Sequence, residues 1–253
     1  MYNPEQVGHG ENLDQRFDGL SLRQRLVAIQ ELFPGRLVFT TSFGLEDQAL
    51  THAIAVAGLD IRIATLDTGR LFPETYDLWS ETEARYGMRI EGFTPDHARL
   101  EKLVAEIGIN GFRNSVENRK ACCGVRKLEP LTRALAGAQG WIVGLRAEQS
   151  AFRAGTSFVN HDPMQGLPKI APLADWSRAE VERYVSDNAV PYNPLHDRGF
   201  PSIGCAPCTR AVRVGEPERA GRWWWETEDK KECGLHGRPG FETLAREPAL
   251  AEG

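Results

Sequence analysis

Apolar residues recur at helix-like and strand-like spacings from residue 22 to about residue 188. The first helix has its apolar residues on one face and ends at Pro34-Gly35. Pro73 and a capping box starting at Ser177 support two later helix starts. The pattern predicts helices at 22–33, 46–57, 73–86, 96–107 and 177–187, and strands at 37–40, 61–66, 88–93 and 141–145.

This alternation of strands and helices predicts an α/β fold, with a mostly parallel sheet covered by helices on both faces. In such sheets ligands bind beyond the carboxyl ends of the strands. After Pro191 the composition changes, and Pro, Gly, Cys, Arg and Trp dominate as far as Gly240. We therefore expect a single domain over residues 1–253, in which about 191–253 form an irregular C-terminal extension.

Charge and composition argue against several classes of protein. The chain has 253 residues, 30 Lys+Arg against 35 Asp+Glu, and a net charge of −5, which tells against a general nucleic-acid binder. No apolar run reaches the length of a membrane-spanning helix, and residues 1–6 lack a secretion signal. Five cysteines without such a signal indicate a reducing compartment. We expect a cytoplasmic protein that binds neither nucleic acid nor membrane.

Four of the five cysteines come in two pairs, Cys122-Cys123 and Cys205-Ala206-Pro207-Cys208. Two cysteines separated by two residues are a common metal-chelating arrangement. Buried apolar cysteines or a redox disulfide are the alternatives. Four thiolates suit zinc or an iron–sulfur cluster. The tandem pair favours the cluster, because adjacent side chains diverge and reach one ion poorly, but spacing leaves both metals open.

The fifth cysteine, Cys233, has a basic setting. Lys230 and Lys231 precede it, and His236 follows three residues later. Nearby positive charge lowers the pKa of a thiol and raises the fraction of nucleophilic thiolate. The alternative is an ordinary exposed cysteine near the C-terminus.

Polar residues follow the first two predicted strands. Ser42 and Gly44 precede a helix whose first N–H groups suit a phosphate. Asp67-Thr68-Gly69 follows the next strand at the same sheet edge, so the two loops together indicate a nucleotide. Turn geometry alone also explains such residues.

Basic residues lie at predicted strand ends and in the extension. Arginine forks suit phosphate and sulfate oxygens, so this set indicates a dianionic ligand, although most surface arginines are simply solvated. The set comprises Arg126, Lys127, Arg146, Arg153, Arg219 and Arg222. We expect the adjacent tryptophans, residues 223–225, to pack the extension onto the domain.

From about Thr40 to His236 the chain resembles the assimilatory sulfonucleotide reductases, and within them the bacterial adenylyl-sulfate (APS) reductases. The resemblance lies in both cysteine pairs and in five segments. These are Ser42-Phe43-Gly44 with Glu46-Asp47, the run from Asp67 to Thr75, Arg126-Lys127, Gly204-Cys205-Ala206-Pro207-Cys208, and Glu232-Cys233-Gly234-Leu235-His236. Phosphoadenylyl-sulfate (PAPS) reductases generally keep the last segment and lack the two pairs.

The resemblance implies an adenine nucleotide alpha hydrolase-like fold and a nucleophilic Cys233. It implies a [4Fe-4S] cluster on Cys122, Cys123, Cys205 and Cys208, so the extension carries half of the cluster ligands. Implied substrate contacts are Ser42, Gly44, Leu66, Lys127, Gly144, Arg153, Arg219, Arg222 and His236. Two positions depart from the family pattern. Arg146-Ala147 stands where paired arginines are usual, and Gly124 stands where a larger residue is frequent.

The implied reaction begins with attack of the Cys233 thiolate on the sulfur of APS. AMP leaves, and a second thiol releases sulfite from the S-sulfocysteine. Only seventeen residues follow His236, too few for a fused reductant domain, so we expect thioredoxin as an external partner. Because Cys233 must meet both APS and a protein, we expect its segment to move as a lid. We also expect a homo-oligomer.

Three other functions remain open at the level of sequence. PAPS reduction, or dual use of APS and PAPS, would need an extra cationic pocket. An ATP-dependent tRNA-thiolation-type enzyme on the same fold would want a Ser-Gly-Gly-x-Asp-Ser loop and a basic RNA-binding face. A zinc-stabilised binding module would have no chemistry and no colour.

Overall fold

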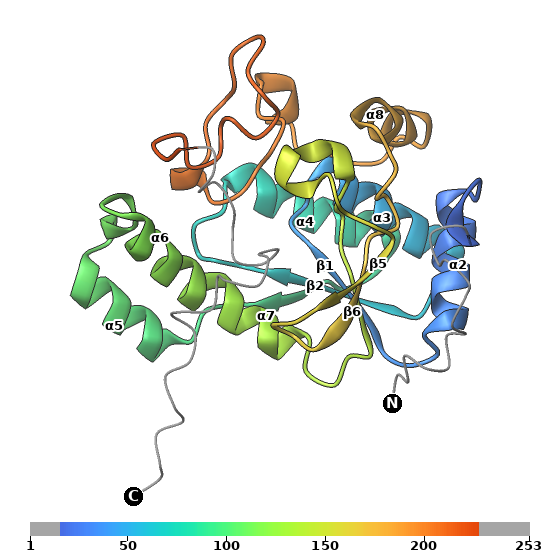
Figure 1. Cartoon of the computed structure of the whole chain (residues 1–253), viewed down its shortest axis with the longest axis horizontal. Helices are drawn as coiled ribbons and strands as arrows, with labels where there is room; N and C mark the ends of the chain where they lie inside the picture. The colour runs from blue at the N-terminus through green and yellow to red at the C-terminus, as the bar shows by residue number, and fades with distance from the viewer. Residues whose placement is uncertain (1–15, 228–253) are drawn as a thin grey trace, which may run out of the picture.

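The computed structural model describes residues 16–227, in which one six-stranded sheet forms the centre (Figure 1). The strand order is β3-β2-β1-β4-β6-β5. All neighbouring strands are parallel except β5, which pairs antiparallel with β6 at one edge. This confirms the predicted mostly parallel sheet. The strands are β1 (Leu37–Thr41), β2 (Ile61–Leu66), β3 (Glu91–Phe93), β4 (Gly140–Ile142), β5 (Val159–Asp162) and β6 (Leu167–Ile170).

Helices cover the sheet on both faces. Figure 1 shows α2, α3, α4 and α8 on one side and α5, α6 and α7 on the other. In agreement with this view, α3 packs on β1, α2 and α8, whereas α7 packs on β2 and β3. The helices are α2 (Leu22–Leu32), α3 (Leu45–Ala57), α4 (Pro73–Tyr86), α5 (His97–Ile107), α6 (Val116–Cys123), α7 (Glu129–Ala134) and α8 (Arg178–Asp187).

Local capping fixes several helix ends. The Ser177 hydroxyl accepts a hydrogen bond from the Glu180 N–H, and the Glu180 side chain reaches back, as the sequence predicts for α8. Pro73 occupies the first turn of α4. Gly58 ends α3 with a φ of +61°, a conformation that favours glycine.

The sequence pattern misplaces or misses some elements. The predicted strands at 88–93 and 141–145 shorten to β3 and β4, because each pairs with its neighbours over only two or three residues. Helices α6 and α7 and the β5–β6 hairpin were not predicted. Their sequences explain this: α6 buries only Arg119, and β5 (VNHD) has no apolar alternation.

The apolar core lies where β1, β4 and α3 meet. Leu37, Val38 and Phe39 of β1 are at most 1% exposed, and Trp141 and Ile142 of β4 are equally buried. Chain connections leave β1 and reach β4 on opposite faces of the sheet, so a crevice opens beyond the carboxyl ends of these two strands. The core therefore holds the floor of this crevice rigid.

The first part of the extension, residues 191–227, lies across the same sheet edge (Figure 1). It is irregular, apart from short 3₁₀ turns at His196–Arg198 and Ala206–Cys208. The Ala206 N–H donates to the Arg70 carbonyl at 2.8 Å and ties the extension to the loop after β2. Within residues 16–227 no helix is long and apolar enough to cross a membrane.

Candidate active site

A large cavity opens at the carboxyl ends of β1, β2 and β4. It encloses about 1270 Å³ of atom-free space, part of it open to solvent. Eight of the nine implied substrate contacts line it: Ser42, Gly44, Leu66, Lys127, Gly144, Arg153, Arg219 and Arg222. His236, the ninth, and Cys233 lie outside the described residues. We call this space the nucleotide cavity.

The loop after β1 is closed by its own carboxylate. The Ser42 N–H and hydroxyl both donate to Asp47 Oδ2, at 2.6 and 2.7 Å. Burial raises the pKa of Asp47 to about 6, against the opposing effect of the Ser42 hydrogen bonds. The Ser42 hydroxyl is therefore directed at Asp47 and not at the phosphate that the sequence predicts there.

Gly144 sits directly against this loop. A Cβ at Gly144 would lie 2.2 Å from Asp47 Oδ1 and 3.2 Å from Glu46 Cβ. The absence of a side chain lets the segment after β4 approach the start of α3 at the cavity floor. The reason for glycine here is thus close packing against α3.

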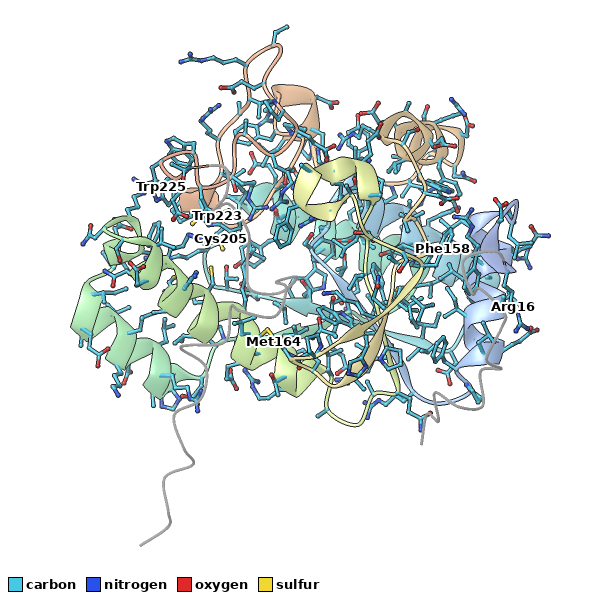
Figure 2. All side chains as sticks on the ribbon, viewed as in Figure 1. Arg16, Phe158, Met164, Cys205, Trp223 and Trp225 are labelled. Atoms are coloured by element: carbon cyan, nitrogen blue, oxygen red, sulfur yellow. The ribbon has the colours of Figure 1, made fainter. Side chains whose placement is uncertain are left out.

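The two cysteine pairs meet in a second, smaller space. Cys122, Cys123, Cys205 and Cys208 line a cavity with about 400 Å³ of atom-free space, part of it open to solvent, which we call the cysteine cavity. The pairs come from the end of α6 and from either end of the 3₁₀ turn at 206–208. Cys205 Sγ lies 3.3 Å from the Thr68 hydroxyl, so this cavity also touches the loop after β2. Figure 2 shows Cys205 beside Trp223 on the side of the extension that faces α6.

A π-helical turn, Gly124–Leu128, carries basic residues to the cysteines. The buried Arg126 donates from Nη1 to the Thr68 carbonyl at 2.5 Å. Lys127, one residue later, lines both cavities. π-turns are frequent at functional sites, and this one turns two successive cations toward the sheet edge.

The chemistry of the cysteine cavity fits an iron–sulfur cluster. Burial raises the pKa of Cys208 to about 12 and, more modestly, that of Cys122. Such thiols ionise when a cationic metal core takes the place of their protons. In residues 16–227 no three Cys, His, Asp or Glu side chains converge closely enough to hold one metal ion as they stand.

Lys127, Arg222 and Trp223 line both cavities and form a shared wall. The indole of Trp223, a residue 1% exposed, has the Arg222 guanidinium carbon 4.7 Å from its ring centroid. A Cβ at Gly204 would lie only 2.3 Å from Arg222 Nη2, so glycine makes room for this guanidinium beside Cys205. Trp223 packs the extension onto the domain, as predicted.

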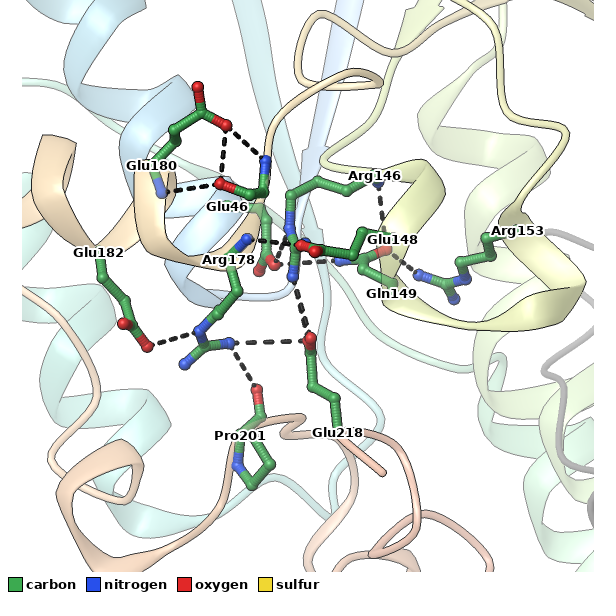
Figure 3. A network of polar contacts seen from close by, with 11 residues as sticks. Glu46, Arg146, Glu148, Gln149, Arg153, Arg178, Glu180, Glu182, Pro201 and Glu218 are labelled. Atoms are coloured by element: carbon green, nitrogen blue, oxygen red, sulfur yellow. Dashed lines mark hydrogen bonds and ion pairs between the residues drawn. The ribbon is translucent and has the colours of Figure 1, made fainter. Parts of the chain in front are cut away.

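Arg146 corrects one sequence-based expectation. Its side chain is 0% exposed, and its guanidinium is committed to three carboxylates: Nε to Glu46 (2.8 Å), Nη1 to Glu148 (3.3 Å) and Nη2 to Glu218 (3.0 Å) (Figure 3). A guanidinium committed in this way does not bind a ligand anion. Position 147 is alanine, so neither residue of this pair supplies a cation to the ligand.

The pKa values of Glu46 and Glu218 shift in opposite directions, although Arg146 lowers both. Burial raises the pKa of Glu46, but attraction to Arg146 outweighs it and leaves that pKa below its usual range. Burial and the neighbouring Glu46 charge raise the pKa of Glu218 despite the same arginine. The ionised form is therefore less favoured at Glu218 than at Glu46.

Sequence reasoning missed His196, which also lines the nucleotide cavity. Both ring nitrogens are buried, and neither has a partner in hydrogen-bond geometry within residues 16–227. Burial and the positive charge of Arg178 lower its pKa to about 4, so the ring is neutral at physiological pH. No sequence motif surrounds His196, and its place in the cavity wall depends on how the extension packs.

Comparison with known proteins places this site in a family. The phosphoadenosine phosphosulfate reductase domain matches residues 36–211. The adenosine 5'-phosphosulfate reductase of Sinorhizobium fredii (strain USDA 257) is 56% identical over 224 residues, which cover 88% of this chain and 89% of that protein. The protein of the same name from Allochromatium vinosum is 54% identical over 213 residues, covering 84% and 82%.

Solved structures agree with this assignment. Phosphoadenylyl-sulfate reductase from Candida auris, in a phosphate complex, has a TM-score of 0.70 and 28% identity, and the match covers 84% of this chain and 98% of that one. The FMN adenylyltransferase of Candida glabrata, with a TM-score of 0.52 and 16% identity, shares the fold alone. The domain match and the identity to relatives that are covered over more than four-fifths of their length lead to one conclusion: the chain belongs to the phosphoadenosine phosphosulfate reductase family.

Proposed function

We propose that this chain reduces adenylyl sulfate to sulfite and AMP in assimilatory sulfate reduction. One observation carries the proposal: the nucleotide cavity at the strand ends and the cavity of four cysteines share the wall of Lys127, Arg222 and Trp223. The names of the relatives, which are 54–56% identical, support APS as the substrate.

The cations of the nucleotide cavity are proposed to hold the phosphosulfate. Lys127, Arg153, Arg219 and Arg222 line one space, and the attack brings an anionic thiolate toward an anionic group. Fixed positive charge in a partly dry site lowers the barrier to such an attack. Leu66 and Gly144 at the strand ends border the space left for the nucleoside.

In the proposed reaction the Cys233 thiolate attacks the sulfate sulfur. An S–S bond forms, the S–O bond to AMP breaks, and AMP leaves as its phosphate anion. A thiolate of thioredoxin then attacks Cys233 Sγ and displaces sulfite. The second thioredoxin thiol resolves the mixed disulfide, so the dithiol supplies both electrons.

We propose that Cys122, Cys123, Cys205 and Cys208 hold a [4Fe-4S] cluster. Four cysteines in one cavity form the thiolate set that such clusters take. When bound, the cluster tunes the charge beside Lys127, and thiol exchange itself needs no one-electron carrier. A cytoplasmic location suits these reduced thiols. The lid movement of the Cys233 segment and a homo-oligomeric state remain predictions.

The structure of the loop after β1 weakens the tRNA-thiolation alternative. Asp47 stands where a Ser-Gly-Gly-x-Asp-Ser loop has its second serine, so this loop carries a carboxylate in place of that hydroxyl. PAPS reduction keeps the support of the 28% identical structure. Measuring kcat/KM for APS and PAPS on the same preparation separates the two nucleotides.

The test begins with anaerobic purification and analysis of iron and sulfide. We expect a brown protein that forms sulfite from APS with thioredoxin. Mass spectrometry after mixing with APS alone should find SO₃ added to the peptide containing Cys233. The Cys233→Ser variant should bind AMP and keep its iron but form no sulfite. Sulfite formation at the normal rate by that variant would refute the covalent step, and a colourless zinc protein would refute the cluster.

A further inference from the structure

The ion pairs around Arg146 reach two of the cations assigned to the phosphosulfate. The group consists of Arg146, Arg178, Glu46, Glu148 and Glu218, and we call it the Arg146 network (Figure 3). It joins the start of α3, the segment after β4, the start of α8 and the extension. Arg146 at its centre is 0% exposed, so the network is a fixed part of the fold.

Gln149 connects this network to Arg153. Its Oε1 accepts hydrogen bonds from Arg153 Nη1 at 2.5 Å and from the Arg146 N–H at 3.2 Å. Its Nε2 donates to Glu46 Oε1 at 3.1 Å. Both ends of the amide are therefore used, which fixes its orientation and directs its oxygen at the Arg153 guanidinium.

Glu218 connects the network to Arg219. Its carboxylate accepts from Arg146 Nη2 at 3.0 and 3.3 Å and lies 3.6 Å from Arg178 Nη1. Arg219 follows directly in the chain, and its carbonyl accepts from the Arg222 N–H at 3.0 Å. Glu218 thus anchors the turn that presents both arginines to the nucleotide cavity.

Charge gives the network a second effect on the site. Three glutamates against two arginines leave it with one excess negative charge. Cations gathered for a dianion repel one another when no ligand is bound, and a nearby negative group offsets that repulsion. The network therefore favours the arrangement of Arg153 and Arg219 before the substrate arrives.

We propose that Gln149 and Glu218 are positioning residues, which hold Arg153 and Arg219 in place for the phosphosulfate through the Arg146 network. The inference rests on the proposed function, because that assigns the two arginines to the anion. Neither positioning residue needs to touch the substrate for this effect. Fixing an arginine before binding improves affinity by reducing the loss of side-chain freedom.

Two double-mutant cycles on the full, iron-loaded chain test the proposal. One compares Glu218→Gln, Arg219→Ala and the double variant, and the other compares Gln149→Ala, Arg153→Ala and their double variant. Calorimetry gives Kd for AMP, and for APS with Cys233→Ser added to prevent turnover. We expect E218Q and Q149A each to raise Kd for APS about tenfold. In the R219A or R153A background the same change should cost less than about twofold.

Glu74→Gln is the matched control. Glu74 of α4 pairs with Arg198 of the extension at 3.0 Å, and neither residue lines the nucleotide cavity or belongs to the Arg146 network, so Kd should not change. Iron content and thermal midpoints establish that each variant is folded. Additive cycles, or unchanged Kd in E218Q and Q149A, would overturn this inference alone. Normal APS binding by R153A and R219A would overturn the anion assignment together with it.

Discussion

At the scale of single residues, two buried groups of the nucleotide cavity make the stability of the fold depend on pH in opposite ways. His196 has a pKa lowered by burial to about 4 from 6.5, and Asp47 has a pKa raised by burial to about 6 from 3.8. The unfolded chain protonates His196 first, so acid destabilises the fold through this group. The folded chain protonates Asp47 first, so acid stabilises the fold through that one. Each effect amounts to roughly 3 kcal/mol over its range, and the two oppose each other.

We predict that replacing either His196 or Asp47 leaves the pH dependence of stability that the other residue contributes. Relative to the natural chain, His196→Gln should gain stability as the pH falls from 6.5 to 4. Asp47→Asn should lose stability as the pH falls from 6 to 3.8. Urea unfolding at several pH values measures both differences. Differences that stay constant with pH in both variants would show that neither group is buried as described.

At the scale of elements, the π-helical turn after α6 does not require the glycine at position 124. Its φ and ψ of −55° and −54° are helical, and a Cβ there would meet nothing within 4 Å. The turn therefore accommodates the larger residue that the family often has. Glycine at a helical position costs stability because the unfolded chain is freer.

We predict that Gly124→Ala raises the free energy of unfolding by about 0.5–1 kcal/mol. Gly58→Ala is the matched control, because its Cβ also meets open space but its φ is +61°. That variant should lose about 1 kcal/mol. Denaturant unfolding of both variants gives the comparison, and a loss of stability in Gly124→Ala would contradict the described backbone.

The elements also show what the pattern of apolar residues can and cannot predict. The strands β1 and β2 and the helices α3 and α4 were predicted almost to the residue. Both strands and α3 are buried along most of their length, and α4 starts at Pro73 and ends at Gly87. Helix α6 buries Arg119, which pairs with Glu226 from the extension at 2.7 Å. A helix that is fixed by a partner more than a hundred residues away cannot be predicted from its own apolar pattern.

At the scale of the whole molecule, the four cysteines join two distant parts of the chain. Cys122 and Cys123 end a helix, whereas Cys205 and Cys208 lie in the extension. A metal group bound by all four would therefore act as a cross-link. Such links stabilise mainly by restricting the open chain, and more so for longer loops.

We predict that anaerobic removal of iron loosens the extension and leaves the sheet intact. Brief trypsin digestion of iron-free protein should cut faster after Arg210 and Arg213 than digestion of loaded protein. Cleavage after Arg62, which lies within β2, should not change and serves as the internal control. Equal cleavage after Arg210 in the two forms would contradict the cross-link.

The site was predictable only in part at this scale. Spacing marked the cysteine pairs, and strand ends marked the loops at Ser42 and Asp67, because both signals are local. Gly144 was implied only by the family resemblance. The ion pairs of Arg146 with three glutamates could not be predicted from the sequence. Glu46, Glu148 and Glu218 lie up to 172 positions apart and meet only after folding. The same holds for His196.

The burial of Arg146 also constrains how this sequence can change over generations. Loss of the arginine alone would strand three carboxylates, two of them largely shielded from water, and loss of Glu46 alone would leave a buried cation partly unmatched. Viable replacements of Glu46 and Arg146 must therefore arrive together, because either change alone leaves buried charge unpaired. Positions 46 and 146 should vary as a unit among descendants of this chain.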